Sequence, residues 1–515
     1  MIGGGRASST RDLLLAIDQQ TTRSRAFIYT PDGQVLAQAE KPLRQIYPGP
    51  GRIEFDPREI LADVVEVCRA ALARAGAAAA DLAGIGIANQ RETTLLWDAE
   101  TGAPLANAIS WQDRRTAAHC AALRAEGLEA DIALRTGLRL DPTFSATKLT
   151  WLLDALPGAR TRAETGGLRF GTVDSWLLWQ LSAGAVHATD ATNAARTLLF
   201  NLHGQDWDPV LLAAFRVPPP VLPRVLDSCG DLGIADAGLF GAAVPIRAVI
   251  GNQQGALAGQ DCVRQGQANC SYASGAFTLV HAGAAVPRSK HRLLATPAWR
   301  IGGVAAFALE GAILNAGTAI TWLSDRLGVL RDAADSELLA EAAEDSPVYF
   351  VPAFTGFGAP HWNADARGAI LGISRDTSRA EIARAALEAQ AFQTRDLLDA
   401  IELDLGAAIS RLRVDGGLTH NDFACQAIAD LCGVAVERPA DLNAAARGAA
   451  ILAGIGAGLI ASLDAAPAWR PDRVFEPRMG ASTRSEKLAG WQSAVRAVLT
   501  MAGGRGADHG TARAP

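Results

Sequence analysis

Two polar segments of the chain carry residue types that could do chemistry, and each directly follows an apolar run. Residues 243–250 (AVPIRAVI) predict a buried strand, because they are apolar and partly β-branched without a helical period, and Gly251-Asn252-Gln253-Gln254 comes next. A strand end near mid-chain, where two domains would meet, is a typical place for a ligand site. An ordinary turn in which Asn252 caps the next helix is the alternative.

The second polar segment, residues 89–94 (NQRETT), follows the apolar residues 85–88 (IGIA). Its adjacent side chains Arg91 and Glu92 could hold the hydroxyl groups of a small polar molecule, since a guanidinium donates hydrogen bonds and a carboxylate accepts them. A solvated ion pair at a turn fits the same two residues equally well, so the pair alone does not decide the question.

Two further turns have the composition of anion or nucleotide sites. Residues 19–24 (QQTTRS) bear small hydroxyl side chains, as expected where hydroxyl and backbone N–H groups face an anion. The strand predicted at 412–415 runs into Gly416-Gly417, which lets a flat ligand approach the backbone, and a helix should begin near Asn421. No GxxxxGK[ST] segment and no complete GxGxxG segment occur, which argues against P-loop and Rossmann nucleotide sites.

The elements that must position these segments fall into two similar halves. Residues 13–39 predict an antiparallel meander of three strands, and residues 268–282 predict a strand, a small-residue turn and a strand that echo it. Helices are predicted at 57–75, at 171–181 and after the capping box of Ser378 and Glu381. We therefore expect an α/β fold with two domains, at residues 11–255 and 256–500, between disordered tails at 1–10 and 501–515.

Length and composition are consistent with this organisation. A chain of 515 residues exceeds what one hydrophobic core usually supports. The net charge of −6, without any block of basic residues, argues against nucleic acid as a partner, and no apolar run is long enough for membrane insertion, so we expect a cytoplasmic protein. Seven scattered cysteines without a CxxC pair predict buried free thiols rather than disulfides or a zinc site.

Over about residues 12–500 the chain resembles the FGGY family of sugar and polyol kinases. The motifs that carry the resemblance are residues 89–94 (NQRETT), 111–116 (WQDRRT), 171–174 (GTVD), 355–360 (TGFGAP) and a helix signature at 368–388. They stand as they do in the family members that phosphorylate glycerol. The resemblance implies two actin-like (ribonuclease H-like) domains with ATP and Mg²⁺ in a nucleotide cleft between them. It also implies transfer of the γ-phosphate to glycerol, and we expect a homodimer or homotetramer.

The resemblance assigns roles to individual residues. Arg91, Glu92 and Gln253 would bind glycerol hydroxyls, and Asp18 would sit near the magnesium. The glycerol carbons would lie against Trp111 and Phe277. The residues implied to contact phosphates or to border the nucleotide are Thr21, Thr22, Arg25, Ser274, Gly317, Thr321, Gly417 and Asn421.

Several positions depart from the family's pattern, mostly on the phosphate side. Gln20 stands where a glycine lets phosphate approach the backbone, and Asn252 stands where an aspartate is the expected general base. The substrate-binding tyrosine is replaced by Thr143, Ser274 stands for a threonine, and Asn443 and Ala445 stand for a glutamate and a threonine. Two functions therefore remain open. One is a working kinase for glycerol, or for a larger polyol that Thr143 would admit. The other is a degenerate kinase that binds a polyol or nucleotide as a sensor or interaction protein.

Overall fold

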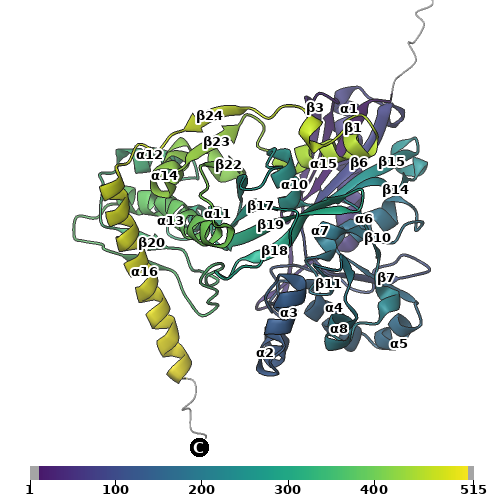
Figure 1. Ribbon diagram of the computed structural model, residues 1–515, viewed down its shortest axis with the longest axis horizontal. Coiled ribbons are helices and arrows are strands. Elements are labelled where there is room, and N and C mark those ends of the chain that lie inside the picture. Colours follow the sequence, from purple (N-terminus) through teal and green to yellow (C-terminus); the bar gives the residue numbers. More distant parts are fainter. Residues whose placement is uncertain (1–10, 509–515) are drawn as a thin grey trace, which may run out of the picture.

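The computed structural model describes residues 11–508, and two mixed β-sheets with flanking helices form its framework (Figure 1). In the first sheet, β1, β2 and β3 pair antiparallel, which confirms the predicted meander, and β1, β6 and β15 run parallel. The order of its strands is β14 (Cys229–Ala235), β15 (Val244–Gly251), β6 (Leu82–Asn89), β1 (Leu13–Gln19), β2 (Arg23–Tyr29) and β3 (Val35–Pro42).

The second sheet repeats the inner arrangement of the first. Three antiparallel strands, β19, β17 and β16, are followed by β22 and β23, which run parallel to β16. Its order is β18 (Leu294–Ile301), β19 (Val304–Ile313), β17 (Ala276–Gly283), β16 (Ala268–Tyr272), β22 (Arg411–Asp415), β23 (Ala435–Pro439) and β24 (Pro471–Phe475). The predicted α/β fold with two similar halves is therefore confirmed. The predicted boundary at 255/256 falls inside the helix that follows β15 and stays a prediction.

Local signals account for the helices that the sequence predicted. Helix α1 (Pro57–Ala75) has its predicted bounds, because the Asp56 side chain accepts a hydrogen bond from the Arg58 N–H and Gly76 ends the helix at φ +64°. Its buried stripe packs on β2 and β3. Helix α13 (Arg379–Leu405) begins with the predicted capping box, and α6 spans Val173–Leu181.

Two helices join the halves of the molecule. Helix α10 (Asn252–Gly259) follows β15 directly and packs on α15 (Ala444–Gly456), which also covers β1, β6 and β15 of the first sheet (Figure 1). Only glycine fits at their closest approach, since a Cβ at Gly259 would lie 1.9 Å from the Ala444 carbonyl oxygen and a Cβ at Gly448 equally close to that of Gly255. Helix α10 also contacts β16, β17 and β18 of the second sheet, so it is held against both sheets.

The remaining elements surround this frame. The smaller sheets contain β4 (Ile46–Gly49), β5 (Arg52–Phe55) and β8 (Ala108–Ile109); β7 (Leu95–Asp98) and β9 (Leu168–Gly171); β10 (Ala188–Asp190) and β13 (Arg224–Leu226); β11 (Phe200–Asn201) and β12 (Asp206–Trp207); and β20 (Tyr349–Val351) and β21 (Ala369–Leu371). The other α-helices are α2 (Ala117–Ala125), α3 (Glu129–Thr136), α4 (Ser145–Ala155), α5 (Ala159–Glu164), α7 (Ala191–Ala194), α8 (Pro209–Ala214), α9 (Ala237–Phe240), α11 (Gly317–Asp325), α12 (Asp335–Ala342), α14 (Asp422–Cys432) and α16 (Ala481–Asp508).

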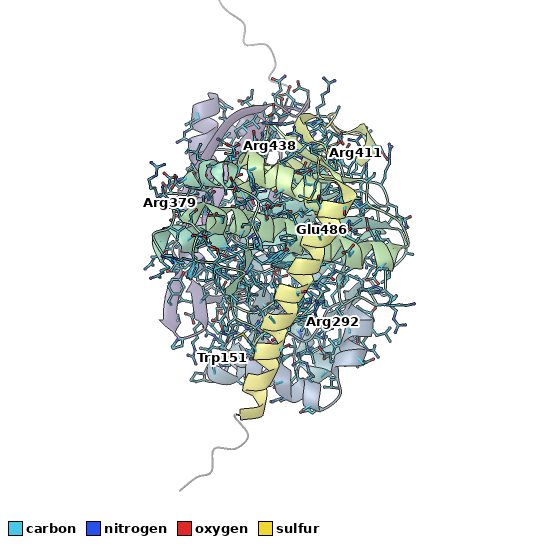
Figure 2. All side chains as sticks on the ribbon, turned by 90° about the vertical axis from the view of Figure 1, so that its left-hand side faces the viewer. Trp151, Arg292, Arg379, Arg411, Arg438 and Glu486 are labelled. Carbon is cyan, nitrogen blue, oxygen red and sulfur yellow. The ribbon has the colours of Figure 1, made fainter. Side chains whose placement is uncertain are left out.

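The C-terminal helix corrects one prediction. Helix α16 crosses the outer side of the second half and continues to Asp508, so the expectation of disorder is wrong for residues 501–508 of the predicted tail (Figure 2). Its buried stripe outweighs the glycines that suggested disorder: Trp491 stacks on Phe392 of α13 at 5.2 Å between ring centroids, and Ala502 is still buried. The predicted tail at 1–10 and residues 509–515 lie outside the described residues.

Two expectations from composition concern the cysteines and membrane-spanning helices. All seven cysteines are buried and free, as predicted, and burial raises the pKa of the Cys120 thiol to about 11. Within residues 11–508, no helix combines the length and the apolar character that crossing a bilayer requires.

Candidate functional site

Three parallel strands of the first sheet end at the same level. Gln19 of β1 lies in register with Asn89 of β6, which lies in register with Gly251 of β15. Neighbouring strands are spaced about 4.8 Å apart, so the polar segments that follow them share one edge of the sheet. The first two segments are bonded directly, because the Gln90 N–H donates to the Gln19 carbonyl at 2.6 Å. The structure thus brings together the segments 19–24, 89–94 and 251–254.

Arg91 and Glu92 belong to a buried ring of four charges. Arg91 donates from Nη1 and Nη2 to the two carboxylate oxygens of Glu310, at 2.6 and 3.0 Å. Arg196 donates from Nε to Glu92 Oε1 at 2.6 Å and from Nη2 to Glu310 Oε1 at 3.0 Å. Arg91 and Glu92 are each only 4% exposed, so the alternative of a solvated ion pair is wrong.

The oppositely charged neighbours in this ring offset the effect of burial on the pKa values of Glu310 and Arg91. Burial alone would raise the pKa of Glu310, but the guanidinium groups of Arg196 and Arg91 outweigh it and hold that pKa below its usual value. Burial alone would likewise lower the pKa of Arg91, but Glu310 and Glu92 raise it. The ring is therefore a balanced cluster of two cations and two anions.

The backbone of Glu92 has an uncommon conformation. Its φ of +62° is in the left-handed region, which costs a non-glycine residue about 1 kcal/mol or more. Hydroxyl groups hold this segment from two sides, since Thr94 Oγ1 and Ser145 Oγ both donate to the Glu92 carbonyl, at 2.9 and 2.8 Å. Strain that the surroundings enforce in this way is typical of ligand-binding sites.

An aromatic wall connects this ring with the hydroxyl-rich turn. Trp111 and Phe277 meet edge to face with ring centroids 6.2 Å apart, and the Arg91 guanidinium lies 5.7 Å from the Phe277 ring centroid. Trp111 Nε1 donates to Thr21 Oγ1 at 2.9 Å. Since Phe277 lies on β17, the wall contains side chains from both halves.

Asp18, at the end of β1, is fully buried and partly engaged. Its Oδ2 accepts hydrogen bonds from Arg25 Nη2 at 2.6 Å and from Gln20 Nε2 at 2.8 Å. Arg25 also donates to Asn443, the residue before α15. Asp18 Oδ1 is buried without a hydrogen-bond partner among the described residues. A carboxylate oxygen of this kind suits a divalent cation, although residues 11–508 contain no cluster of three or more potential metal ligands.

The second half contributes two turns at the ends of its strands. The Gly317 N–H donates to the carbonyl of Ala273 at 2.9 Å, and the Ala316 N–H donates to that of Ser274 at 2.9 Å, so the start of α11 lies against the turn after β16. Thr321 is one turn further along α11, where its hydroxyl donates to the Gly317 carbonyl at 3.2 Å. This arrangement joins the first of the two turns to a helix N-terminus.

The second turn follows β22. A Cβ at Gly416 would lie 2.2 Å from the carbonyl oxygen of Tyr272, so only glycine fits there, whereas Gly417 has open space around it. Asn421 caps α14 by accepting a hydrogen bond from the Ala424 N–H at 2.8 Å, which confirms the predicted start of that helix. Burial raises the pKa of the neighbouring Asp415 to about 6.

Four further predicted site residues, Asn252, Gln253, Thr143 and Thr22, differ in their local environment. Asn252 is the first residue of α10 and not its cap, and its Oδ1 accepts from the Gln253 N–H at 2.9 Å, so the helix-cap alternative is wrong. Gln253 Oε1 is buried and, within the described part of the chain, has no hydrogen-bond partner. The Thr143 hydroxyl donates to Asp141 at 2.7 Å. Thr22 is exposed, and its carbonyl accepts from Leu43.

Sequence reasoning missed Glu310, Arg196 and Asp415. Glu310 had a usable signal, because it is the single charged residue in the otherwise apolar strand 304–313 (VAAFALEGAI) and a charge in such a strand needs a buried partner. Asp415 entered only as the last residue of the strand predicted at 412–415, without a role of its own. Arg196 follows α7 in a segment without periodicity, and no signal indicated its partners.

Comparison with known families gives two matches that together cover most of the chain. The N-terminal domain of the FGGY family of carbohydrate kinases matches residues 13–259, and the C-terminal domain of that family matches residues 268–457.

Similar proteins include several named as glycerol kinases. The glycerol kinase of Rhodospirillum rubrum is 52% identical over 95% of this chain and 99% of its own length. That of Rhodospirillum centenum is 53% identical over 94% and 98%, and glycerol kinase 1 of Pseudomonas aeruginosa is 50% identical over 95% and 99%.

Solved structures agree with the predicted fold class. The glycerol kinase of Plasmodium falciparum, determined with ADP, has a TM-score of 0.88 and 32% identity over 96% of this chain and 99% of its own. A xylulose kinase from Rhodospirillum rubrum has a TM-score of 0.82 at 22% identity over 95% and 99%, a likeness that concerns the fold alone. The prediction of two actin-like domains is thereby confirmed.

Proposed function

This chain belongs to the FGGY family of carbohydrate kinases, and we propose that it transfers the γ-phosphate of ATP to a terminal hydroxyl of glycerol, giving sn-glycerol 3-phosphate and ADP. The observation that carries the proposal is the buried Arg91–Glu92 pair beside an aromatic wall, at the edge of the sheet where Asp18 and the hydroxyl-rich turn lie. Relatives named glycerol kinase, 50–53% identical over nearly the whole chain, support the choice of glycerol.

In this proposal the polyol binds to the groups of the ring that remain free. Arg91 keeps its Nε–H and one Nη2–H for hydroxyl oxygens, because its other three donors face Glu310 and Gln254. Glu92 keeps Oε2 to accept from a hydroxyl, since Arg196 bonds its Oε1. Gln253 adds a buried acceptor, and the carbon chain of glycerol would lie against the aromatic wall.

The phosphates of ATP would lie between the hydroxyl-rich turn after β1 and the turn after β16. Thr21, Thr22 and Arg25 face them from the first half, and Ser274 faces them from the second. The start of α11 at Gly317 would favour an anion, because N–H groups at a helix N-terminus carry partial positive charge. Mg²⁺, held at Asp18, would supply charge neutralisation during the transfer. Thr321, Gly417 and Asn421 border the rest of the nucleotide in this proposal.

The attacking hydroxyl must lose its proton as the new O–P bond forms and the bond to ADP breaks. The amide of Asn252 cannot accept that proton, and a missing positioned base costs about 10² to 10⁴ in rate. Phosphoryl transfer depends mainly on positioning and charge stabilisation, so the proton can leave late, to the Asp18 carboxylate or to water. We therefore propose a working enzyme that is slower than one with a carboxylate at residue 252.

The test is ADP formation by purified protein with ATP and Mg²⁺, measured with glycerol, with larger polyols of four and five carbons, and without polyol. Glycerol-dependent ADP and sn-glycerol 3-phosphate are expected in equal amounts. Activity only with a larger polyol would replace the substrate, in line with the smaller side chain at Thr143. No ADP with any polyol, together with polyol binding in calorimetry, would contradict the kinase. The proposed protein is cytoplasmic and forms a homodimer or homotetramer. Sedimentation of the purified protein tests the oligomeric state.

A further inference from the structure

We propose that Glu310 and Arg196 form a positioning pair that holds the polyol-binding side chains Arg91 and Glu92 in their productive orientation. The inference rests on the proposed function of Arg91 and Glu92 and adds two residues that would touch neither polyol nor nucleotide. Each member of the pair holds one of the binding residues, and the two members are bonded to each other at 3.0 Å.

Glu310 fixes the plane of the Arg91 guanidinium. Its two oxygens accept from Nη1 and Nη2, a two-point contact that leaves the guanidinium little freedom to rotate. The directions of the remaining Nε–H and Nη2–H are therefore set by Glu310 and not by Arg91 alone. Because Glu310 is completely buried, water cannot replace it as an acceptor without opening the site.

Arg196 holds Glu92 by a single hydrogen bond. Its Nε–H engages Glu92 Oε1, so Oε2 is the oxygen that stays available. The Arg196 guanidinium is itself confined, since it lies 5.2 Å from the centroid of the Phe144 ring and bonds Glu310. Its Nη1 is buried without a hydrogen-bond partner among the described residues.

The pair also links the two halves of the molecule. Glu310 lies on β19 of the second sheet, opposite Leu279 of β17, two residues along that strand from Phe277. Arg91 and Glu92 follow β6 of the first sheet, and Arg196 follows α7. Figure 1 shows β17, β18 and β19 at the centre of the molecule, where the halves meet. The polyol site is thus complete only while β19 keeps this place, and polyol affinity depends on the contact between the halves.

The test compares Glu310→Gln, Glu310→Asp and Arg196→Lys with the wild type. Glu310→Gln keeps the shape but turns an NH₂ group toward a guanidinium, and Glu310→Asp keeps the charge but withdraws it by one methylene. We expect each folded variant to raise the KM and the Kd for glycerol by about tenfold or more, the value of one charge-assisted hydrogen bond, and to leave the KM for ATP unchanged. Thermal unfolding gives the folded fraction by which each rate is corrected.

Glu388→Gln is the matched control. Glu388 is also a buried glutamate in an ion pair, with Arg384 at 2.9 Å, but it lies on α13. A purely structural role for Glu310 would make both glutamine variants less stable and leave the glycerol KM unchanged in both.

Three results would overturn the inference. The first is an unchanged glycerol KM in folded Glu310→Asp and Arg196→Lys, which carry the test if Glu310→Gln does not fold. The second is an equal rise of the glycerol KM in Glu388→Gln. The third is a wild type that binds no polyol in calorimetry, which overturns the proposed function as well. The first two leave the proposed function standing.

Discussion

Trimming the Gln20 side chain should strengthen magnesium activation. The Gln20 amide donates to Asp18 Oδ2 at 2.8 Å, on the same carboxylate whose free Oδ1 we assign to the metal, and so competes with the cation for the charge of that carboxylate. The turn itself does not need this side chain, because the Gln20 N–H donates to the Arg23 carbonyl at 2.9 Å and its carbonyl accepts from Gln19 Nε2 at 2.9 Å. Gln20→Ala should therefore leave the backbone of the turn in place.

The size of the effect follows from the bond that is removed. A hydrogen bond to a charged group contributes about 1.5 to 3 kcal/mol, which corresponds to roughly tenfold to 150-fold in an equilibrium constant. Arg25 keeps its own bond to Asp18 Oδ2 at 2.6 Å in the variant, so the low end of this range applies. We expect the Mg²⁺ concentration for half-maximal activity to fall by about tenfold.

The assay is steady-state ADP formation at saturating glycerol and fixed ATP over a Mg²⁺ titration. Gln45→Ala is the matched control, because the Gln45 amide bonds the Thr21 carbonyl of the same turn at 3.4 Å and not Asp18. An unchanged or higher Mg²⁺ requirement in Gln20→Ala would refute the reasoning, as would the same fall in both alanine variants.

Three further predictions concern the polyol site, the missing base and a buried carboxyl group. Arg91→Lys keeps a cation beside Glu310 but loses the planar guanidinium with its several N–H donors, so the Kd for glycerol should rise about tenfold in calorimetry. An unchanged Kd would mean that the polyol binds elsewhere. Asn252→Asp should raise kcat at least about tenfold. If Gln20 also obstructs the γ-phosphate, only the double variant with Asn252→Asp and Gln20→Gly should show this rise in kcat. Equal inactivity of the wild type, the two single variants and the double variant would contradict the proposed kinase activity. Burial raises the pKa of Asp174 to about 7, so its stabilising contribution is complete below about pH 4 and is lost as the pH rises through 7. The free energy of unfolding of the wild type, measured against Asp174→Asn, should fall by about 4 kcal/mol over that window, and a constant difference would disprove the shift.

The parts of the fold that local signals encode were predictable from sequence. Pro57 at the first position of α1 and Gly76 after its last residue mark the two ends of that helix. The capping box of Ser378 and Glu381 likewise marks the start of α13, and these signals lie next to the helix ends in the sequence. The convergence of the polar segments was also predictable in kind, because parallel neighbouring strands end at one edge of a sheet.

The buried ring shows where that reasoning stops. Arg91 and Glu310 are 219 residues apart, and Arg196 and Glu310 are 114 apart, so only the assembled sheets bring them together. From sequence, Arg91 and Glu92 look like partners of each other, yet their closest charged atoms are 3.9 Å apart and both make shorter bonds to other residues. The end of α16 is a similar case, since packing of Trp491 on Phe392 overrides the composition of the last residues.

The two unusual residues of the site differ in what they do to their surroundings. The Asn252 Oδ1 bonds the N–H of the next residue, so this amide removes a base without engaging the groups that would bind ligands. Gln20 instead bonds Asp18, so in the proposed site its effect would extend to the metal and the phosphates. Among the described residues, neither amide is hydrogen-bonded to the ring of Arg91, Glu92, Arg196 and Glu310, which is held together by its own four charges. We therefore expect polyol affinity and turnover to be separable: substitutions at residues 20 and 252 should change rate and Mg²⁺ dependence, and substitutions in the ring should change affinity for the polyol.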